Sequence, residues 1–214
     1  MARTLFRGAD IFDGDRLGPG SLLVEGGRIA AILPADTAAP DRAGSVELGG
    51  GTLCPGFVDL QANGGGGVMF NDTPDVATLA RIAGAHARLG TLTLLPTLVT
   101  DMPEITRAAV DAVSEAVARG VPGIAGLHLE GPHLSLARKG AHDPSLIRPM
   151  TGDDLGFLLE AARKLPRLLV TIAPESVATE QISEMAKAGI VVSLGHTDAG
   201  FDACRAAFAA GARV

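Results

Sequence analysis

The sequence predicts an α/β protein: a (β/α)8 TIM-type barrel, with about the first five βα units present, preceded by a small β-sheet domain. From about residue 53, near-continuous apolar runs alternate with stretches of helical periodicity, as in parallel strands covered by helices. Polar residues follow each apolar run. Barrel enzymes carry their sites at the carboxyl ends of all strands, whereas a doubly wound sheet would gather polar groups near one switch point.

Residues 1–52 have a different pattern of short strands and turns, with a hairpin signal at Gly26-Gly27. We expect a small N-terminal β-rich domain or β extension, which is rather short for burying both faces of a sandwich alone. Residues 53–214 are then expected to form the first part of a (β/α) barrel.

The elements of the second domain follow in regular alternation. The expected strands are 56–61, 91–99, 123–130, 167–175 and 190–197, and the expected helices are 74–90, 102–120, 151–166, 178–189 and 198–211. Gly90, Gly120 and Gly189 stand where a C-cap glycine would. Residues 212–214 look like the first residues of a sixth strand. Because a barrel needs eight strands and about 250 residues, we expect a fragment.

Composition limits the functional classes. The 214 residues are 47% hydrophobic and carry a net charge of -6, which disfavours non-specific nucleic-acid binding. The longest apolar runs fall far short of the roughly 20 residues that cross a membrane. Cys54 and Cys204 form no disulfide framework, and the N-terminal residues show no secretory leader pattern, so a cytoplasmic location is expected.

Glu130 and His196 are the first candidates for chemistry. Each lies at or near the carboxyl end of an expected parallel strand, so a barrel would aim both into one cavity. Carboxylate and imidazole are zinc ligands, and a catalytic zinc takes three protein ligands plus water. The alternative is a buried salt-bridged Glu and a satisfied core His. Because no nucleophile elbow appears, metal-activated water is favoured over an acyl-enzyme.

Asp59, Gln61 and Asn63 alternate along the first barrel strand and therefore share a face. Many metal hydrolases of this type carry His-x-His there, but the amides of Gln61 and Asn63 are poor zinc ligands. We expect this side to bind substrate or water, or else to be a polar strand end. The following run of four glycines, 64–67, would be a flexible connector or a loop that lets backbone approach closely.

The remaining histidines have competing interpretations. His128 shares the face of Glu130 and is expected to be a packed histidine rather than a ligand. His133 and His142 follow the same strand, beside Arg138 and Lys139. They would form either a solvated basic loop or a patch that contacts a polar substrate.

Three motifs, "PGFVDLQANGGGG", "HLEGPHLSLARKGAHDP" and "SLGHTDA", occur in this order along the chain. Together they closely resemble the N-acetylglucosamine-6-phosphate deacetylase family of the amidohydrolase superfamily. The resemblance spans the whole chain, and the middle motif is highly specific to the family. It implies that residues 1–52 are part of a composite β-sandwich and that residues 53–214 are the first part of a metal-dependent hydrolase barrel. It implies cytoplasmic amino-sugar metabolism, with release of acetate and glucosamine 6-phosphate from N-acetylglucosamine 6-phosphate. It also implies a homodimer with a divalent metal ion, most often zinc.

The resemblance implies roles for particular residues. Glu130 and His196 match metal ligands, and Gln61 matches a residue at or near the metal-bound water, with Asn63 on the same side. Ala141 and His142 match the pair that contacts substrate. His128 is a candidate donor to the oxyanion. The family's third metal ligand, its general-base Asp and most of its phosphate contacts correspond to positions beyond Val214. We therefore expect this chain alone to be inactive.

Two other functions stay open. One is an amidohydrolase that acts on a different amide, such as a cyclic amide, although those relatives usually keep the His-x-His pair that Gln61 and Asn63 replace. The other is a non-catalytic fragment, since the chain carries two of the three expected metal ligands and no general base.

Overall fold

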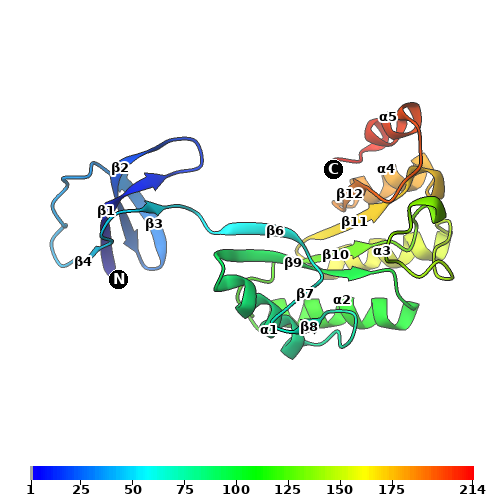
Figure 1. The fold of residues 1–214 in the computed structure, drawn as a ribbon, viewed down its shortest axis with the longest axis horizontal. Coiled ribbons are helices and arrows are strands. Elements are labelled where there is room, and N and C mark those ends of the chain that lie inside the picture. The colour runs from blue at the N-terminus through cyan, green and yellow to red at the C-terminus, as the bar shows by residue number, and fades with distance from the viewer. Residues whose placement is uncertain (1) are drawn as a thin grey trace. The chain divides into compact units, whose positions relative to one another are not determined.

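The structure is a computed structural model that describes residues 2–214. The chain divides into two compact units, residues 1–56 and 57–214 (Figure 1), and each is described by itself. Among the described residues, no helix has the length and apolarity that a membrane crossing requires.

The N-terminal unit is one mixed five-stranded sheet. Its strands are β1 (Arg3–Phe12), β2 (Leu17–Glu25), β3 (Arg28–Leu33), β4 (Gly44–Glu47) and β5 (Thr52–Leu53). β3, β2 and β1 are antiparallel neighbours, while β4 and β5 pair in parallel with β1. The predicted hairpin is confirmed: Gly26 and Gly27 join β2 to β3 with φ of 58° and 78°, as a two-residue hairpin turn requires.

The division between the units falls after Gly56 rather than after residue 52. Leu53 lies in β5, opposite Ile11 of β1, so its backbone bonds belong to the N-terminal sheet. The apolar run that begins the barrel starts at Phe57, where β6 pairs with β9.

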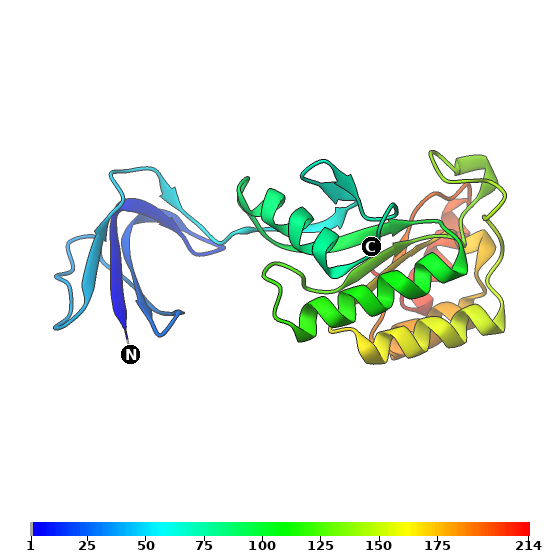
Figure 2. The ribbon, with the colours of Figure 1, turned by 90° about the horizontal axis from the view of Figure 1, so that it is seen from below.

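The second unit is a parallel five-stranded sheet in the order β12-β11-β10-β9-β6. Its strands are β6 (Phe57–Ala62), β9 (Thr91–Val99), β10 (Leu127–Glu130), β11 (Leu168–Ile172) and β12 (Val191–Leu194). Its helices are α1 (Val76–Ala87), α2 (Pro103–Ala118), α3 (Gly152–Lys164), α4 (Thr179–Lys187) and α5 (Phe201–Ala210). Each helix contacts the next along the chain (Figures 1 and 2). The expected βα alternation is thus confirmed.

Short elements complete the unit: the β7 (Gly64–Gly65) and β8 (Val68–Met69) hairpin, and the 3-10 turns η1 (Leu136–Arg138) and η2 (Pro174–Ser176). The expected sixth strand is not formed as an element. Its residues nonetheless begin to pair with β12, because the Arg213 amide donates to the Val192 carbonyl and the Leu194 amide donates to the Val214 carbonyl.

Register decides which side chains share a face of this sheet. His128 lies opposite Thr97 and Leu169, and Glu130 lies opposite Val99 and Thr171. Since side chains alternate along a strand, His128 and Glu130 point to one face, while Leu127 and Leu129 point to the other and join the apolar core under the helices.

Candidate metal centre

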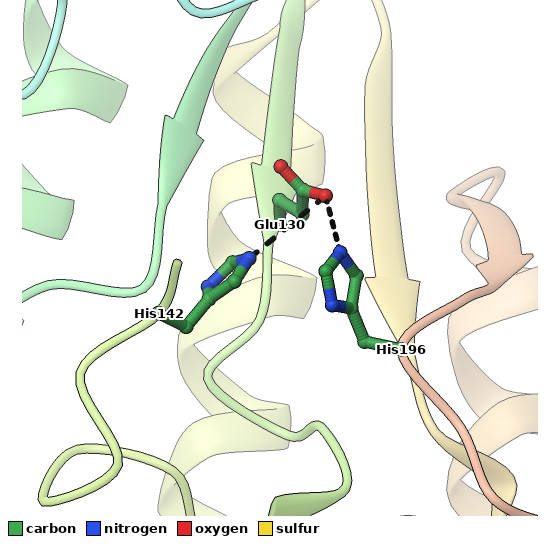
Figure 3. A group of neighbouring side chains, drawn as sticks. All are labelled: Glu130, His142 and His196. Carbon is green, nitrogen blue, oxygen red and sulfur yellow. Dashed lines mark hydrogen bonds and ion pairs between the residues drawn. The ribbon is translucent and has the colours of Figure 1, made fainter. Parts of the chain in front are cut away.

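Three side chains converge at the carboxyl ends of the barrel strands (Figure 3). Glu130 ends β10, His142 lies in the long loop that follows it, and His196 follows β12. One ligand atom from each lies within 4.8 Å of the others. Glu130 and His142 are buried and His196 is half-buried, so the group is a largely shielded cluster of side-chain types that can hold a metal ion.

The two oxygens of Glu130 have different neighbours. Oε2 accepts a hydrogen bond from the Gln61 side-chain amide at 3.1 Å. Oε1 faces His196 Nε2 at 2.9 Å and His142 Nε2 at 3.9 Å. The rings of His142 and His196 lower the pKa of Glu130 to about 2, although burial of the carboxylate opposes the shift. Glu130 is therefore a carboxylate at neutral pH.

The ring of His196 is oriented for ligation. Its Nδ1 lies 2.8 Å from the Arg138 carbonyl oxygen, which can only accept, so Nδ1 carries the proton. In the neutral ring, Nε2 then presents a lone pair to Glu130 Oε1. Two lone-pair atoms at 2.9 Å need a proton or a cation between them. A ligating His that donates its other N–H to a carbonyl is the usual arrangement around a metal.

The ring of His142 is held differently. The Thr100 backbone amide donates to its Nδ1 at 3.3 Å, and Thr100 Oγ1 lies 2.8 Å from the same atom. Because an amide N–H can only donate, Nδ1 is an acceptor and the proton of the neutral ring is on Nε2. His142 thus presents an N–H toward the Glu130 carboxylate.

A divalent cation fits this donor set. Glu130 Oε1 and His196 Nε2 offer a carboxylate and an oriented imidazole, the nitrogen and oxygen ligands that zinc takes. The tautomer of His142 suits a hydrogen-bond donor beside the cation better than a third ligand. The buried Glu and His cluster is therefore consistent with a metal site.

His128 lies beneath the cluster, with both ring nitrogens engaged. Nδ1 lies 3.1 Å from Thr97 Oγ1, and Nε2 lies 2.8 Å from Thr171 Oγ1. It is a packed histidine held between two hydroxyls from neighbouring strands. In this arrangement neither nitrogen is free for an oxyanion.

The neutrality of His128 is testable. Burial lowers its pKa to about 4, so the folded protein binds fewer protons there than the unfolded chain, whose histidine titrates near 6.5. The resulting stabilisation is complete above about pH 6.5 and is lost as the pH falls from there toward about 4. An NMR pH titration of the ring is expected to show protonation only near pH 4, and titration near 6.5 would contradict this account.

Of the residues predicted to contact substrate, Gln61 and His142 have contacts with Glu130. Gln61 reaches Glu130, and Ala141 is exposed in the loop immediately before His142. Asn63 is half-buried, and its carbonyl accepts from the Phe70 amide. Asp59 lies beside His86 on α1, with His86 Nδ1 and Asp59 Oδ2 3.8 Å apart.

The glycine run after Asn63 makes close backbone contacts. A Cβ on Gly64 would lie 2.3 Å from the Val68 carbonyl oxygen across the β7–β8 hairpin, and one on Gly65 would lie 2.9 Å from the His86 ring. His86 Nε2 is also 2.9 Å from the Gly64 carbonyl. The run is therefore a packed turn against α1, rather than a flexible connector.

The predicted basic loop after β10 is neither wholly solvated nor a single patch. His133 and His142 are buried, whereas Arg138 and Lys139 are exposed. His133 Nδ1 contacts the Arg148 carbonyl, and burial lowers the pKa of His133.

Thr171, the partner of His128, was not predicted. Its place in the buried run 168–172, in register with Glu130, is the signal that could have found it.

Comparisons with known proteins identify relatives of this chain. No protein-family model matches the chain. It is 47% identical over 165 residues to an N-acetylgalactosamine-6-phosphate deacetylase of Shewanella sp. (strain ANA-3), covering 77% of this chain and 41% of the relative. It is 36% identical over 192 residues to an N-acetylglucosamine-6-phosphate deacetylase of Haemophilus influenzae, covering 90% and 50%.

Solved structures show the same likeness. An N-acetylglucosamine-6-phosphate deacetylase from Pasteurella multocida superposes with a TM-score of 0.92 at 34% identity, covering 98% of this chain and 55% of that one. A mutant of the Mycobacterium smegmatis enzyme, in complex with N-acetyl-D-glucosamine-6-phosphate, gives 0.86 at 37% identity, covering 99% and 54%.

The mixed N-terminal sheet and the five-stranded parallel half-barrel, with the Glu and His cluster at its strand ends, define a partial barrel of the amidohydrolase fold. Within that class, the chain is a homologue of the N-acetylglucosamine-6-phosphate deacetylase family, which includes relatives named for the galactosamine epimer. The chain spans about half the length of the curated relatives it matches.

Proposed function

We propose that this chain forms part of a metal-dependent deacetylase that removes acetyl from N-acetylglucosamine 6-phosphate. The observation that carries the proposal is the Glu130–His196 pair, 2.9 Å apart, with the His196 tautomer set by the Arg138 carbonyl. The names of the relatives support an N-acetylated amino-sugar 6-phosphate as the substrate class.

Glu130 and His196 would hold the cation, with zinc favoured by the mixed oxygen and nitrogen donors. When bound, a divalent cation supplies Lewis acidity and lowers the pKa of coordinated water toward about 7. Gln61 orients Glu130 by donating to Oε2, which leaves Oε1 for the cation. This chain's own share of the reaction is thus binding and orientation.

His142, Ala141 and Asn63 would form the wall that contacts substrate. The Nε2–H of His142 suits an acceptor such as a sugar hydroxyl or the acetamide oxygen, because Thr100 fixes the ring with that proton pointing toward the cluster. His128 is a packed residue beneath the site, where its ring contacts hydroxyls of the two neighbouring strands. The proposal assigns the general base to no residue of this chain, and we expect the chain alone to be inactive.

The galactosamine epimer is a second candidate substrate. The Shewanella relative is named for N-acetylgalactosamine 6-phosphate, and its identity of 47% exceeds the 36% of the Haemophilus relative. A cyclic-amide substrate has weaker support. A D-hydantoinase superposes with a TM-score of 0.57 at only 18% identity, which supports a shared fold alone.

The test is acetate release from both 6-phosphates, measured on the 214-residue chain and on the product of the whole reading frame that contains it. Each is assayed after loading with zinc and after treatment with a chelator. We expect zinc-dependent release by the whole product on one or both epimers. Release of ammonia or ring opening of a cyclic amide, without acetate from either sugar, would contradict the proposal.

A further inference from the structure

Three successive strand-end loops meet around His196. They are the loop after β10, which carries Ser135 and Arg138, the η2 turn after β11, which carries Glu175, and residues 196–198 after β12. The contacts among these loops fix the backbone on both sides of His196, and Glu175 contributes to them without touching Glu130 or the His196 ring.

Glu175 binds the two residues that follow His196. Its Oε1 accepts the Asp198 backbone amide at 2.8 Å, and its Oε2 accepts the Thr197 hydroxyl at 2.5 Å. Thr197 Oγ1 in turn accepts the Ala199 amide at 2.9 Å. Both oxygens of one carboxylate are therefore used to fix the path of residues 197–199.

The loop after β10 holds the same segment from the other side. The Arg138 guanidinium donates to Asp198 Oδ1 from Nε at 2.9 Å and from Nη2 at 2.8 Å. The Arg138 carbonyl accepts from His196 Nδ1, and the Ser135 amide donates to the His196 carbonyl at 2.9 Å. Asp198 is thus held at its amide by Glu175 and at its carboxylate by Arg138.

His196 needs such support because its backbone is left-handed, with φ of 49°. Residues with a side chain rarely adopt this region, and they persist there where the surroundings over-determine them. Gly140 also packs closely here, since a Cβ on it would lie 3.3 Å from His196 Cε1. Without the contacts at 197 and 198, the ring could rotate away from the Arg138 carbonyl.

We infer that Glu175 is a positioning residue for the metal centre: by binding Thr197 and Asp198, it keeps His196 left-handed, with Nδ1–H on the Arg138 carbonyl and Nε2 toward Glu130. The inference rests on the proposed metal site for its consequence. It concerns the orientation of His196, which is measurable without metal.

The test compares Glu175→Ala with wild type by two readouts on the 214-residue chain. The first is the tautomer of the His196 ring without metal, from two-bond nitrogen–proton NMR correlations. We expect Nδ1 to carry a proton throughout the wild-type population, whatever proton Nε2 shares with Glu130 Oε1, and a mixture of rings with and without a proton on Nδ1 in the variant. The second is Co²⁺ binding, followed by the visible absorption of the ion. We expect binding about tenfold weaker in the variant, the lower end of the loss typical for groups that orient metal ligands.

Three further variants separate positioning from a general effect on folding. Glu175→Gln keeps an acceptor for the Asp198 amide, so its His196 tautomer and its Co²⁺ affinity should both be close to those of wild type. Thr197→Val removes the hydroxyl that binds Glu175, so it should change the His196 tautomer and weaken Co²⁺ binding, each by less than Glu175→Ala does. Glu184→Ala, which removes an exposed glutamate of α4, should leave both signals unchanged.

The outcomes distinguish the inference from the proposed function. An unchanged His196 tautomer in both Glu175→Ala and Thr197→Val would overturn the inference, whether or not Co²⁺ binds. If wild type binds no Co²⁺, the proposed metal site fails, while a changed tautomer in the variants would still support the positioning role.

Discussion

Replacing Glu130 with Gln is expected to weaken divalent-metal binding by this chain at least about a hundredfold. Glu130 Oε1 is the anionic atom that faces both His196 and His142, and its side chain is almost fully buried. Removing one charged partner from a buried pair costs about 3 kcal/mol or more, which is about two factors of ten in an equilibrium constant. Calorimetric titration with Zn²⁺ measures the effect directly.

The same substitution should change how stability depends on pH. The pKa of Glu130 is lowered to about 2, so its stabilisation is present above the unfolded value near 4.3 and is lost as the pH falls toward about 2. Glu130→Gln should therefore flatten the acid limb of the unfolding free energy. Glu184→Gln makes the same charge change on an exposed face of α4 and serves as the control. Zinc affinity equal to wild type in Glu130→Gln would exclude Glu130 as a ligand.

Much of the second unit could be predicted because its signals are local. Helical periodicity placed α3 within 151–166, and the structure begins it at Gly152 because Thr151 and Asp154 form a capping box. Gly120 and Gly189 follow the C-cap residues of α2 and α4 with φ of 70° and 84°, as expected for C-terminal glycines. The strand ends then followed from the alternation, which placed Glu130 and His196 at one edge of the sheet.

The loop after β10 could not be predicted in the same way, because its arrangement depends on contacts distant in sequence. His142 reaches the cluster since Thr100, at the end of β9, fixes its Nδ1. His133 is buried since its ring contacts the Arg148 carbonyl, fifteen residues away in sequence. Neither contact has a periodic signal, so a solvated loop and a ligand wall were equally compatible with these residues.

The backbone at Gly131, which follows Glu130, packs closely against residues next to the candidate site. Its φ is 87°, and a Cβ there would lie 2.2 Å from Thr100 Oγ1 and 3.1 Å from Leu134 Cδ1. Gly131→Ala is expected to destabilise the protein by about 3 kcal/mol or more, because left-handed backbone strain and overpacking each cost roughly 1–3 kcal/mol. Denaturant unfolding monitored by circular dichroism measures the loss.

The clash with Thr100 also predicts which part of the candidate site is disturbed. Thr100 Oγ1 lies 2.8 Å from His142 Nδ1, so moving the hydroxyl away from a new methyl group should release the His142 ring. The double variant Gly131→Ala/Thr100→Ala removes the closest contact, so it should recover part of the overpacking cost, while the Leu134 contact and the backbone strain remain. Gly84→Ala, with open space around the new Cβ inside α1, should be neutral or slightly stabilising. A Gly131→Ala protein as stable as wild type would mean that the β10 loop can shift freely, which would undermine the fixed geometry on which the roles of Glu130 and His142 depend.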